Sequence, residues 1–165
     1  MNRLNRVRNI VDSYIEKIEV EPGKDLLAIK RNEYTHSYGV ASLARLLAMK
    51  RGLDSEIAAM IGHLHDIGRI LYNLVDESHG PIGAIEAEKI LWGTLQFNED
   101  EISVIGKAIQ NHSQKDNVGN AYDELIKDAD LLERYLWDSR YFQGEVNTKR
   151  LANIMAEIGL KRESA

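Results

Sequence analysis

Apolar residues recur every three or four positions along most of this chain, which is the period of an amphipathic α-helix. The first such segment carries apolar residues from Leu4 to Ile18 and predicts a helix over residues 3–19. The second predicts a helix over residues 32–51 that ends at Gly52, a residue typical of helix C-termini. Further helices are predicted to begin near Asp54, Pro81, Asn98, Tyr122 and Asn147.

These segments predict an all-α fold, a compact helical bundle of about six to seven helices. The 165 residues are 44% hydrophobic, which suits one globular domain with a real core. We therefore predict a single domain over residues 1–165. Its core is expected over about 32–136, with the N-terminal helix 3–19 and a C-terminal helix 147–160 packed on it.

The charge and the missing cysteines exclude some function classes. A net charge of −5 and a pI of about 5.6 disfavour a general binder of nucleic acid or anionic membranes. Without cysteine there is neither a disulfide nor a thiolate metal site. Because we see no apolar signal segment or membrane span, we expect a cytoplasmic protein. The outer apolar face of the first helix makes a homodimer possible.

The candidate chemistry centres on Gly62–Arg69, an apolar segment that contains His65 directly before Asp66. A buried charge is costly unless it is paired or binds a metal. An imidazole nitrogen beside a carboxylate suits a divalent metal, and the carboxylate can bridge two ions. Adjacent helix residues point about 100° apart, so one ion could reach both side chains only near a helix end.

Four other residues extend this pattern to five successive helical segments, and a bundle can bring such positions to one centre. They are His36, His79, His112 and Asp130. Taken singly, each histidine is more simply a structural or capping residue, and His63, on another face, is predicted to be structural or exposed. Imidazole and carboxylate ligands favour one or two divalent transition-metal ions. Iron or manganese comes first, with cobalt, nickel, zinc or magnesium as alternatives.

Cationic side chains stand beside these candidates. Arg69 lies four residues after His65, and Lys127, Asp130 and Arg134 form one helical stripe. Such a stripe is commonly a solvated ladder of ion pairs, but it equally suits a metal ligand flanked by two phosphate contacts. Polar residues around His112, Asn111 among them, suit the floor of a wet pocket. The aromatic residues Trp137, Tyr141 and Phe142 are predicted to close the core rather than to stack on a ligand.

Together these residues resemble a known family. His36, then His65-Asp66, then Asp130 match the H…HD…D signature of the HD-domain metal-dependent phosphohydrolases, and His65-Asp66-Ile67-Gly68 is its HDIG form. The resemblance covers roughly residues 32–136. The segments around His79 and His112 are similar to the extra histidines of the binuclear branch. That branch includes small bacterial diadenosine-tetraphosphate hydrolases and the HD-GYP phosphodiesterases.

The resemblance implies a role for each matching residue. His36, His65, Asp66 and Asp130 would hold a first metal, with Asp128 as the rival to Asp130. Asp66, His79 and His112 would hold a second metal, so that Asp66 bridges both. Asp66, Arg69 and Lys127 are the predicted catalytic residues, and the predicted substrate contacts are Arg69, Lys127, Arg134 and Asn111.

The expected function is a metal-dependent phosphohydrolase of a nucleotide or another small phosphoester or phosphoanhydride, using metal-activated water. The expected partner is therefore a small phosphorylated substrate. One alternative is a degenerate HD module that binds a nucleotide or partner without turnover. Another is an HD-fold hydrolase or lyase of a non-phosphate small molecule.

Overall fold

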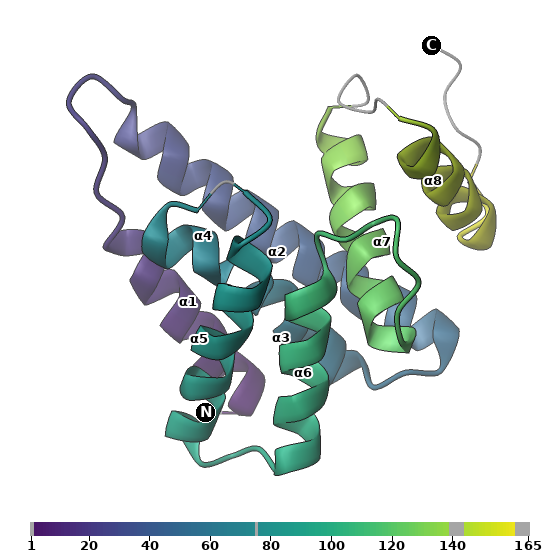
Figure 1. Ribbon diagram of the computed structural model, residues 1–165, viewed down its shortest axis with the longest axis horizontal. Helices are drawn as coiled ribbons and strands as arrows, with labels where there is room; N and C mark the ends of the chain where they lie inside the picture. The colour runs from purple at the N-terminus through teal and green to yellow at the C-terminus, as the bar shows by residue number, and fades with distance from the viewer. Residues whose placement is uncertain (1, 75, 139–143, 161–165) are drawn as a thin grey trace.

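The computed structural model describes residues 2–74, 76–138 and 144–160, and these residues form helices without any strand, as predicted. The described part of the chain contains eight helices: α1 (Arg3–Glu16), α2 (Leu26–Arg51), α3 (Ser55–Leu64), α4 (Ile67–Tyr72), α5 (His79–Thr94), α6 (Glu99–Asn111), α7 (Ala121–Trp137) and α8 (Glu145–Glu157). Figure 1 shows their order from the N-terminus in α1 to α8 near the C-terminus.

The number exceeds the predicted six to seven because the segment that begins at Asp54 is two helices. α3 ends at Leu64 with His65 as its C-cap, and α4 begins at Ile67. Asp66 between them has φ −101° and ψ 17°, outside the α-helical region. This break changes the direction of the chain at the His65-Asp66 pair, so both side chains can face the same centre.

Capping side chains define most of the other boundaries. Asn98 and Asn120 each form a capping box, with Glu101 and Asp123, at the starts of α6 and α7. The prediction for α2 was wrong at its start, because Asp25 caps the helix and adds a turn and a half before residue 32. Its predicted end at Gly52 is right, and that glycine has φ 68°.

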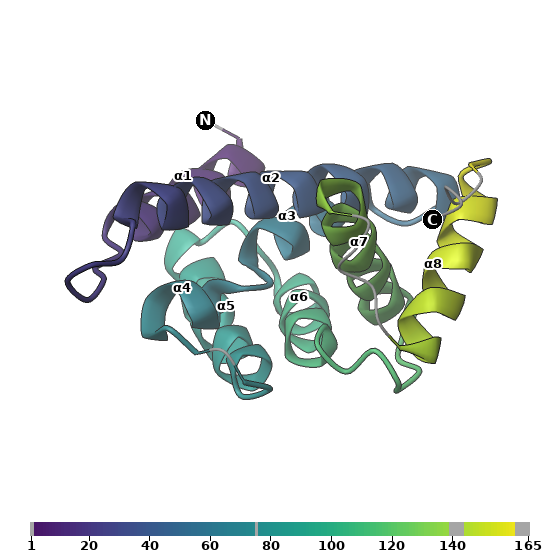
Figure 2. The same ribbon diagram turned by 90° about the horizontal axis from the view of Figure 1, so that it is seen from above.

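Helix α2 is the longest element, and the other helices are arranged along it. Figure 2 shows α1 and α2 along one side of the molecule, α4, α5 and α6 on the other, α7 running from α2 toward that other side, and α8 at one end. Helix α3 packs closely on α2 at Gly62, which has no side chain. A Cβ at this position would clash with the backbone of Ala41. One apolar core, from Val7 in α1 to Met155 in α8, joins the layers.

The aromatic residues predicted to close the core, from Trp137 at the end of α7 onward, are not part of this core where the structure describes them. Trp137 is 68% exposed, so the prediction that it closes the core is wrong. Tyr141 and Phe142 lie outside the described residues. No helix among the described residues is long and apolar enough to cross a membrane.

Candidate metal centre

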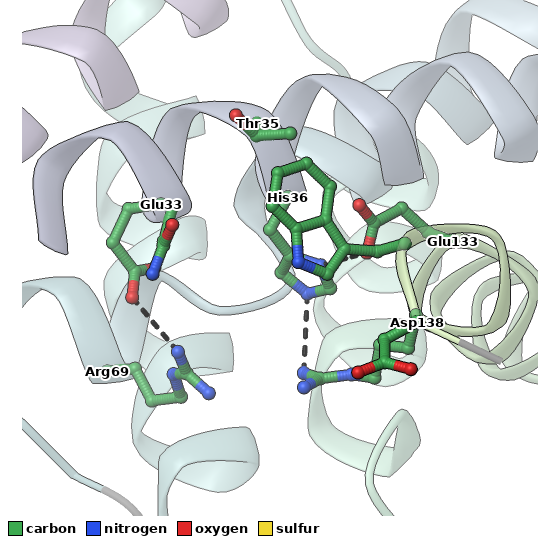
Figure 3. Close-up of a pocket in the computed structure, with 9 residues that line it drawn as sticks. Glu33, Thr35, His36, Arg69, Glu133 and Asp138 are labelled. Carbon is green, nitrogen blue, oxygen red and sulfur yellow. Dashed lines mark hydrogen bonds and ion pairs between the residues drawn. The ribbon is translucent and has the colours of Figure 1, made fainter. Parts of the chain in front are cut away.

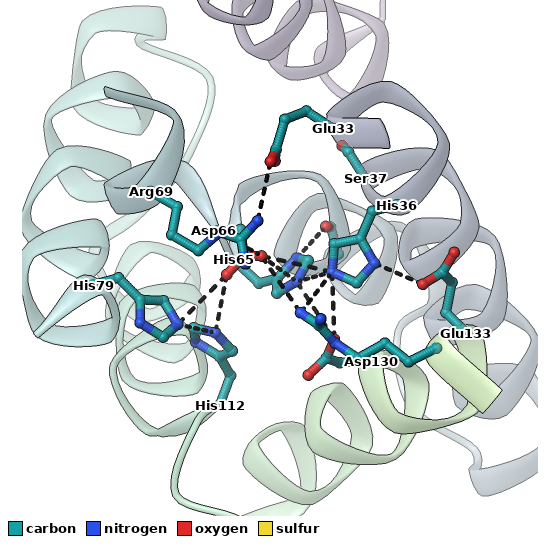
Figure 4. A network of polar contacts seen from close by, with 12 residues as sticks. Glu33, His36, Ser37, His65, Asp66, Arg69, His79, His112, Asp130 and Glu133 are labelled. Atoms are coloured by element: carbon teal, nitrogen blue, oxygen red, sulfur yellow. Dashed lines mark hydrogen bonds and ion pairs between the residues drawn. The ribbon is translucent and has the colours of Figure 1, made fainter. Parts of the chain in front are cut away.

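Asp66 lies between two pairs of histidines, one pair facing each carboxylate oxygen (Figure 4). Its Oδ1 is 3.5 Å from His79 Nε2 and 3.3 Å from His112 Nε2. Its Oδ2 is 3.5 Å from His36 Nε2 and 3.6 Å from His65 Nε2. Four segments of the chain therefore meet at one carboxylate: α2, the α3–α4 break, the start of α5 and the end of α6. Helix α7 adds Asp130, whose Oδ1 lies beside His36.

The outer nitrogen of each imidazole is held by an acceptor, which orients the rings. His65 Nδ1 donates to Gly62 O at 2.8 Å and His112 Nδ1 to Ile109 O at 2.7 Å. His79 Nδ1 donates to Asp76 O. Because a carbonyl oxygen can only accept, each Nδ1 carries the hydrogen. In the neutral ring, Nε2 then presents a lone pair to the centre, as a metal ligand must.

Two features of the centre fit a bound cation. The Nε2 atoms of His36 and His65 are 3.1 Å apart, and those of His79 and His112 are 3.0 Å apart. Facing lone pairs repel at that distance unless a proton or a metal ion lies between them. In addition, Asp66 Oδ2 is buried and has no hydrogen-bond partner among the described residues.

The donor atoms divide into two candidate groups that share Asp66. One contains His36, His65 and Asp66, the other Asp66, His79 and His112, and within each group the ligand atoms lie within 4.8 Å of one another. Nitrogen and carboxylate donors without sulfur suit manganese, iron, cobalt or zinc. The residues present therefore fit a pair of divalent ions.

The electrostatics keep the carboxylates charged. Burial alone would raise the pKa of Asp66, but neighbouring His65, His112 and Arg69 lower it well below its usual range. Burial lowers the pKa of His65 to about 3, so its imidazole stays neutral. Burial also opposes a charge on His36, yet the surrounding carboxylates of Asp130, Asp66 and Glu133 raise its pKa to about 11. These carboxylates therefore stabilise a positive charge at this ring, which is a proton when no metal ion is bound.

Asp130 approaches the first group, whereas its rival Asp128 does not. Asp130 Oδ1 is 3.3 Å from His36 Nε2 and 4.0 Å from His65 Nε2. Asp128 forms ion pairs with Arg51 and Arg150 instead, on the side of α7 that faces α8. The structure therefore places Asp130 at the centre and gives Asp128 a role in helix packing.

Glu133 belongs to the centre but was not singled out from the sequence. Its Oε2 accepts a 2.6 Å hydrogen bond from His36 Nδ1, the role of a carboxylate that orients a metal-binding histidine. A Cβ at Gly39 would lie 2.7 Å from Glu133 Cγ, so the glycine makes room for this contact. The available signal was spacing, because Glu133 follows Asp130 by three residues and so shares its helix face.

Two arginines line a cavity of about 240 Å³ beside His36 (Figure 3). Arg69 donates to Glu33 Oε1 at 3.0 Å, and its Nε is 3.5 Å from Asp66 Oδ2. Arg134 donates to Asp130 Oδ1 at 2.8 Å, and its terminal nitrogen is 3.3 Å from His36 Nε2. Trp137 and Asp138 also line this cavity. Both guanidinium groups thus lie beside the space in which an anion at the centre would bind.

The other two predicted substrate contacts, Lys127 and Asn111, have hydrogen-bond partners of their own within the protein. Lys127 is 1% exposed, and its ammonium donates to Asn117 O at 2.7 Å and to Glu124 Oε1 at 3.0 Å. The predicted catalytic and substrate-binding role of Lys127 is therefore wrong. Asn111 donates to Asp123 Oδ2 at 2.9 Å, and its substrate contact stays a prediction.

Lys115, which no spacing in the sequence singled out, reaches the centre. Its ammonium donates to Asp130 Oδ2 at 2.6 Å and to His112 O at 2.8 Å. The remaining histidine, His63, is buried, and its Nδ1 lies 3.2 Å from Ser37 Oγ. It belongs to neither donor group. Of the two predicted alternatives, structural or exposed, the structure supports the structural one.

A comparison with models of protein families shows the family to which this chain belongs. The family model for the HD domain matches residues 34–135. The chain belongs to the HD-domain family. The matched region runs from α2 through α7 and includes both histidine pairs, Asp66 and Asp130. HD domains bind divalent metals, in agreement with the two donor groups.

Individual relatives of this HD domain include ribonuclease Y proteins. That of Thermus thermophilus is 36% identical over 102 residues, 62% of this chain and 16% of the relative. That of Enterococcus faecalis is 33% identical over 124 residues, 75% of this chain and 22% of the relative. The chain thus spans about a fifth or less of the length of these relatives.

A solved structure has the same fold. The crystal structure of a predicted HD superfamily hydrolase from an uncultured Thermotogales bacterium matches with a TM-score of 0.60 and 21% sequence identity. The match covers 94% of this chain and 88% of that one. Unlike the family model, it includes most of the chain outside residues 34–135.

Proposed function

We propose that this HD domain is a metal-dependent phosphohydrolase with a binuclear centre. The observation that carries the proposal is the position of Asp66, whose two oxygens each face a separate pair of imidazole Nε2 atoms. Membership of the HD family and the ribonuclease relatives support a hydrolase. Iron or manganese is the proposed metal, because both suit mixed nitrogen and oxygen ligands with open positions.

His36, His65, Asp66 and Asp130 would hold one ion, and Asp66, His79 and His112 the other. When bound, such ions supply an activated water at neutral pH and neutralise phosphate oxygens. The chain itself provides the rest of the chemistry. Glu133 and the backbone carbonyls keep the imidazoles oriented, while Arg69 and Arg134 offer guanidinium donors to the phosphate charge that develops during hydrolysis.

The proposed substrate is a small phosphorylated molecule, with a nucleotide as the first choice. The cavity beside His36 is small, at about 240 Å³, and its wall includes the 68% exposed Trp137. An exposed indole beside two guanidinium groups can stack on a nucleobase whose phosphate those groups bind, and such stacking contributes about 1–3 kcal/mol. Dinucleoside polyphosphates belong to this class.

A second candidate substrate is an RNA phosphodiester. The observation that favours it is the similarity to ribonuclease Y over residues that include the centre. The net charge of −5 argues against a long RNA contact, because binding of an extended backbone depends on clustered cations. Cleavage of a short single strand at the cavity would still be compatible with Arg69, Arg134 and Trp137.

The test is hydrolysis by chelator-free protein supplied with Mn²⁺ or Fe²⁺. Substrates are adenosine mono- and diphosphate, diadenosine tetraphosphate, ribose 5-phosphate and a short oligoribonucleotide. We expect turnover of a nucleotide and its loss, by about a thousandfold or more, in Asp66→Asn. The control Asp100→Asn, on the exposed first turn of α6, should retain activity. Turnover of the oligoribonucleotide alone would favour the second candidate, and no turnover of any phosphoester would contradict both.

Trp137 gives a separate test of the nucleotide. In a Trp92→Phe background, in which Trp137 is the only tryptophan, adenosine monophosphate should quench the fluorescence more than ribose 5-phosphate does. Trp137→Ala should raise KM for the nucleotide by roughly tenfold. Equal KM values in the two proteins would exclude stacking on this side chain.

A further inference from the structure

The outer oxygen of Asp130 is held by a loop rather than by a helix. Lys115 lies between α6 and α7, and its ammonium is 2.6 Å from Asp130 Oδ2, a carboxylate that is only 7% exposed. The same ammonium donates to His112 O. One lysine thus joins a candidate ligand of the first group to the backbone of a candidate ligand of the second. The position of this loop therefore affects both groups.

A residue from the C-terminal helix holds the loop in turn. Arg150 of α8 donates to Lys115 O at 3.1 Å, to Glu124 Oε2 at 2.8 Å and to Asp128 Oδ1 at 2.7 Å. Its side chain is 15% exposed. A single guanidinium therefore connects α8, two carboxylates of α7 and the backbone of the residue whose ammonium contacts Asp130.

The same loop is also bound at Asn117 by a buried residue of α7. The buried ammonium of Lys127 donates to Asn117 O and to Glu124 Oε1. Glu124 is shared by Lys127 and Arg150 through its two oxygens. The loop is thus attached to α7 at Asn117 by Lys127, and to both α7 and α8 at Lys115 by Arg150.

The attachment of α8 does not depend on Arg150 alone. Arg51 of α2 donates to both oxygens of Glu157 in α8, at 3.0 and 2.7 Å, and to Asp128 Oδ2 at 2.6 Å. Leu151, Ile154 and Met155 bury the apolar face of α8. Arg51 and Arg150 therefore share Asp128 and both stabilise the position of α8, but of these two only Arg150 contacts the loop.

We propose that Arg150 is a positioning residue of the metal centre, which acts through Lys115 on Asp130 and His112. This inference rests on the metal assignment of the proposed function. Under this inference α8 contributes to the geometry of the metal centre, although it lies outside the region matched by the HD-domain model. Groups that hydrogen-bond metal ligands directly, as Lys115 does here, typically change metal affinity or activity by about 10–100-fold when they are removed. Arg150 acts one contact further out, through the backbone of Lys115.

The test compares Arg150→Met with Arg51→Met in the full chain. Metal-free protein is titrated with Co²⁺, and the dissociation constants are measured by calorimetry and by the visible absorption of the bound ion. We expect Arg150→Met to weaken binding of at least one ion by roughly tenfold and to change its spectrum. Arg51→Met should leave both within about twofold, although it lowers thermal stability. Arg150→Lys should recover part of the affinity, because an ammonium can still reach one acceptor.

Three outcomes would overturn the inference. Unchanged Co²⁺ affinity and spectrum in a folded Arg150→Met variant would show that the residue only anchors α8. Equal losses of affinity in both variants would show a general effect of stability. No uptake of Co²⁺ by the unaltered protein would overturn the binuclear centre together with the inference. If the unaltered protein binds metal but hydrolyses no phosphoester, the proposed function fails alone, since the affinities still decide the role of Arg150.

Discussion

The ammonium of Lys115 lies 2.6 Å from Asp130 Oδ2 and 2.8 Å from the carbonyl of His112. Asp130 approaches His36 and His65, whereas His112 pairs with His79. The lysine therefore connects the two halves of the candidate centre.

Replacing Lys115 by methionine tests this connection. Lys115→Met keeps the length of the side chain but leaves Asp130 Oδ2 without its closest cation. We expect affinity for the first metal to fall by roughly tenfold, measured by titration of metal-free protein with Mn²⁺ or Co²⁺. The exposed Lys89→Met, in α5, is the matched control. An unchanged affinity in Lys115→Met would mean that Asp130 needs no such partner.

The second donor group predicts a change in metal stoichiometry. His79→Ala removes one donor from the group formed by Asp66, His79 and His112. Metal content, measured by elemental analysis, should therefore fall from near two ions per chain toward one. His63→Asn removes a histidine outside both groups, and its metal content should be unchanged even if stability falls. One ion in both the unaltered protein and His79→Ala would instead indicate a mononuclear centre.

Gly39 provides a steric test of Glu133. A Cβ at this position would lie 2.7 Å from Glu133 Cγ, so Gly39→Ala should displace the carboxylate from His36 Nδ1. We expect weaker metal binding, by roughly tenfold, with only a modest loss of stability because a flexible side chain can move. Gly93→Ala, which has open space around its Cβ in α5, should raise stability by about 0.5–1 kcal/mol. Equal metal affinity in the two variants would contradict the role of Glu133.

Glu124 predicts a pH dependence of stability. Although burial opposes its charge, hydrogen bonds from Gly119 N, Lys127 and Arg150 lower its pKa from 4.5 to about 2. Because the folded state lowers this pKa, the stabilisation is present above about pH 4.5 and is lost as the pH falls toward 2. Glu124→Gln should therefore be less stable than the unaltered protein at pH 7, and the difference should shrink below pH 4.5.

Denaturant unfolding at pH 7 and pH 3 measures this difference. Glu21→Gln, whose side chain is 83% exposed, is the control and should change stability by less than about 0.5 kcal/mol at both values. A gap for Glu124→Gln that stays constant between the two pH values would show that the carboxylate charge is not responsible.

Much of this fold was determined by local sequence. Apolar spacing predicted the helical segments, and Asn98 with Glu101 predicted the capping box of α6, because these signals depend on residues within one or two turns. The same reasoning missed the start of α2 at Leu26 and the break of the third segment at Asp66. Nothing in the apolar period marks that break, since it is stabilised by contacts from other helices.

The types of the candidate ligands were also readable in the sequence, because imidazole beside carboxylate in an apolar segment has few other uses. The motif context favoured Asp130 over Asp128, and in the structure Asp130 lies beside His36 whereas Asp128 pairs with Arg51. Helical spacing could not show which lysine would join it. Lys127 shares a stripe with Asp130, but its long side chain turns to Asn117 and Glu124.

Tertiary structure alone decided the partners that lie far apart in the chain. Lys115 reaches Asp130 because α6 and α7 pack side by side and the loop between them folds back over α7. Arg150 reaches that loop because α8 docks against α7. A flexible cationic side chain takes the nearest acceptor in space, and sequence spacing determines that neighbour only within one helix. The sequence by itself determined which donors this protein carries, whereas the packing of its helices decided which of them meet.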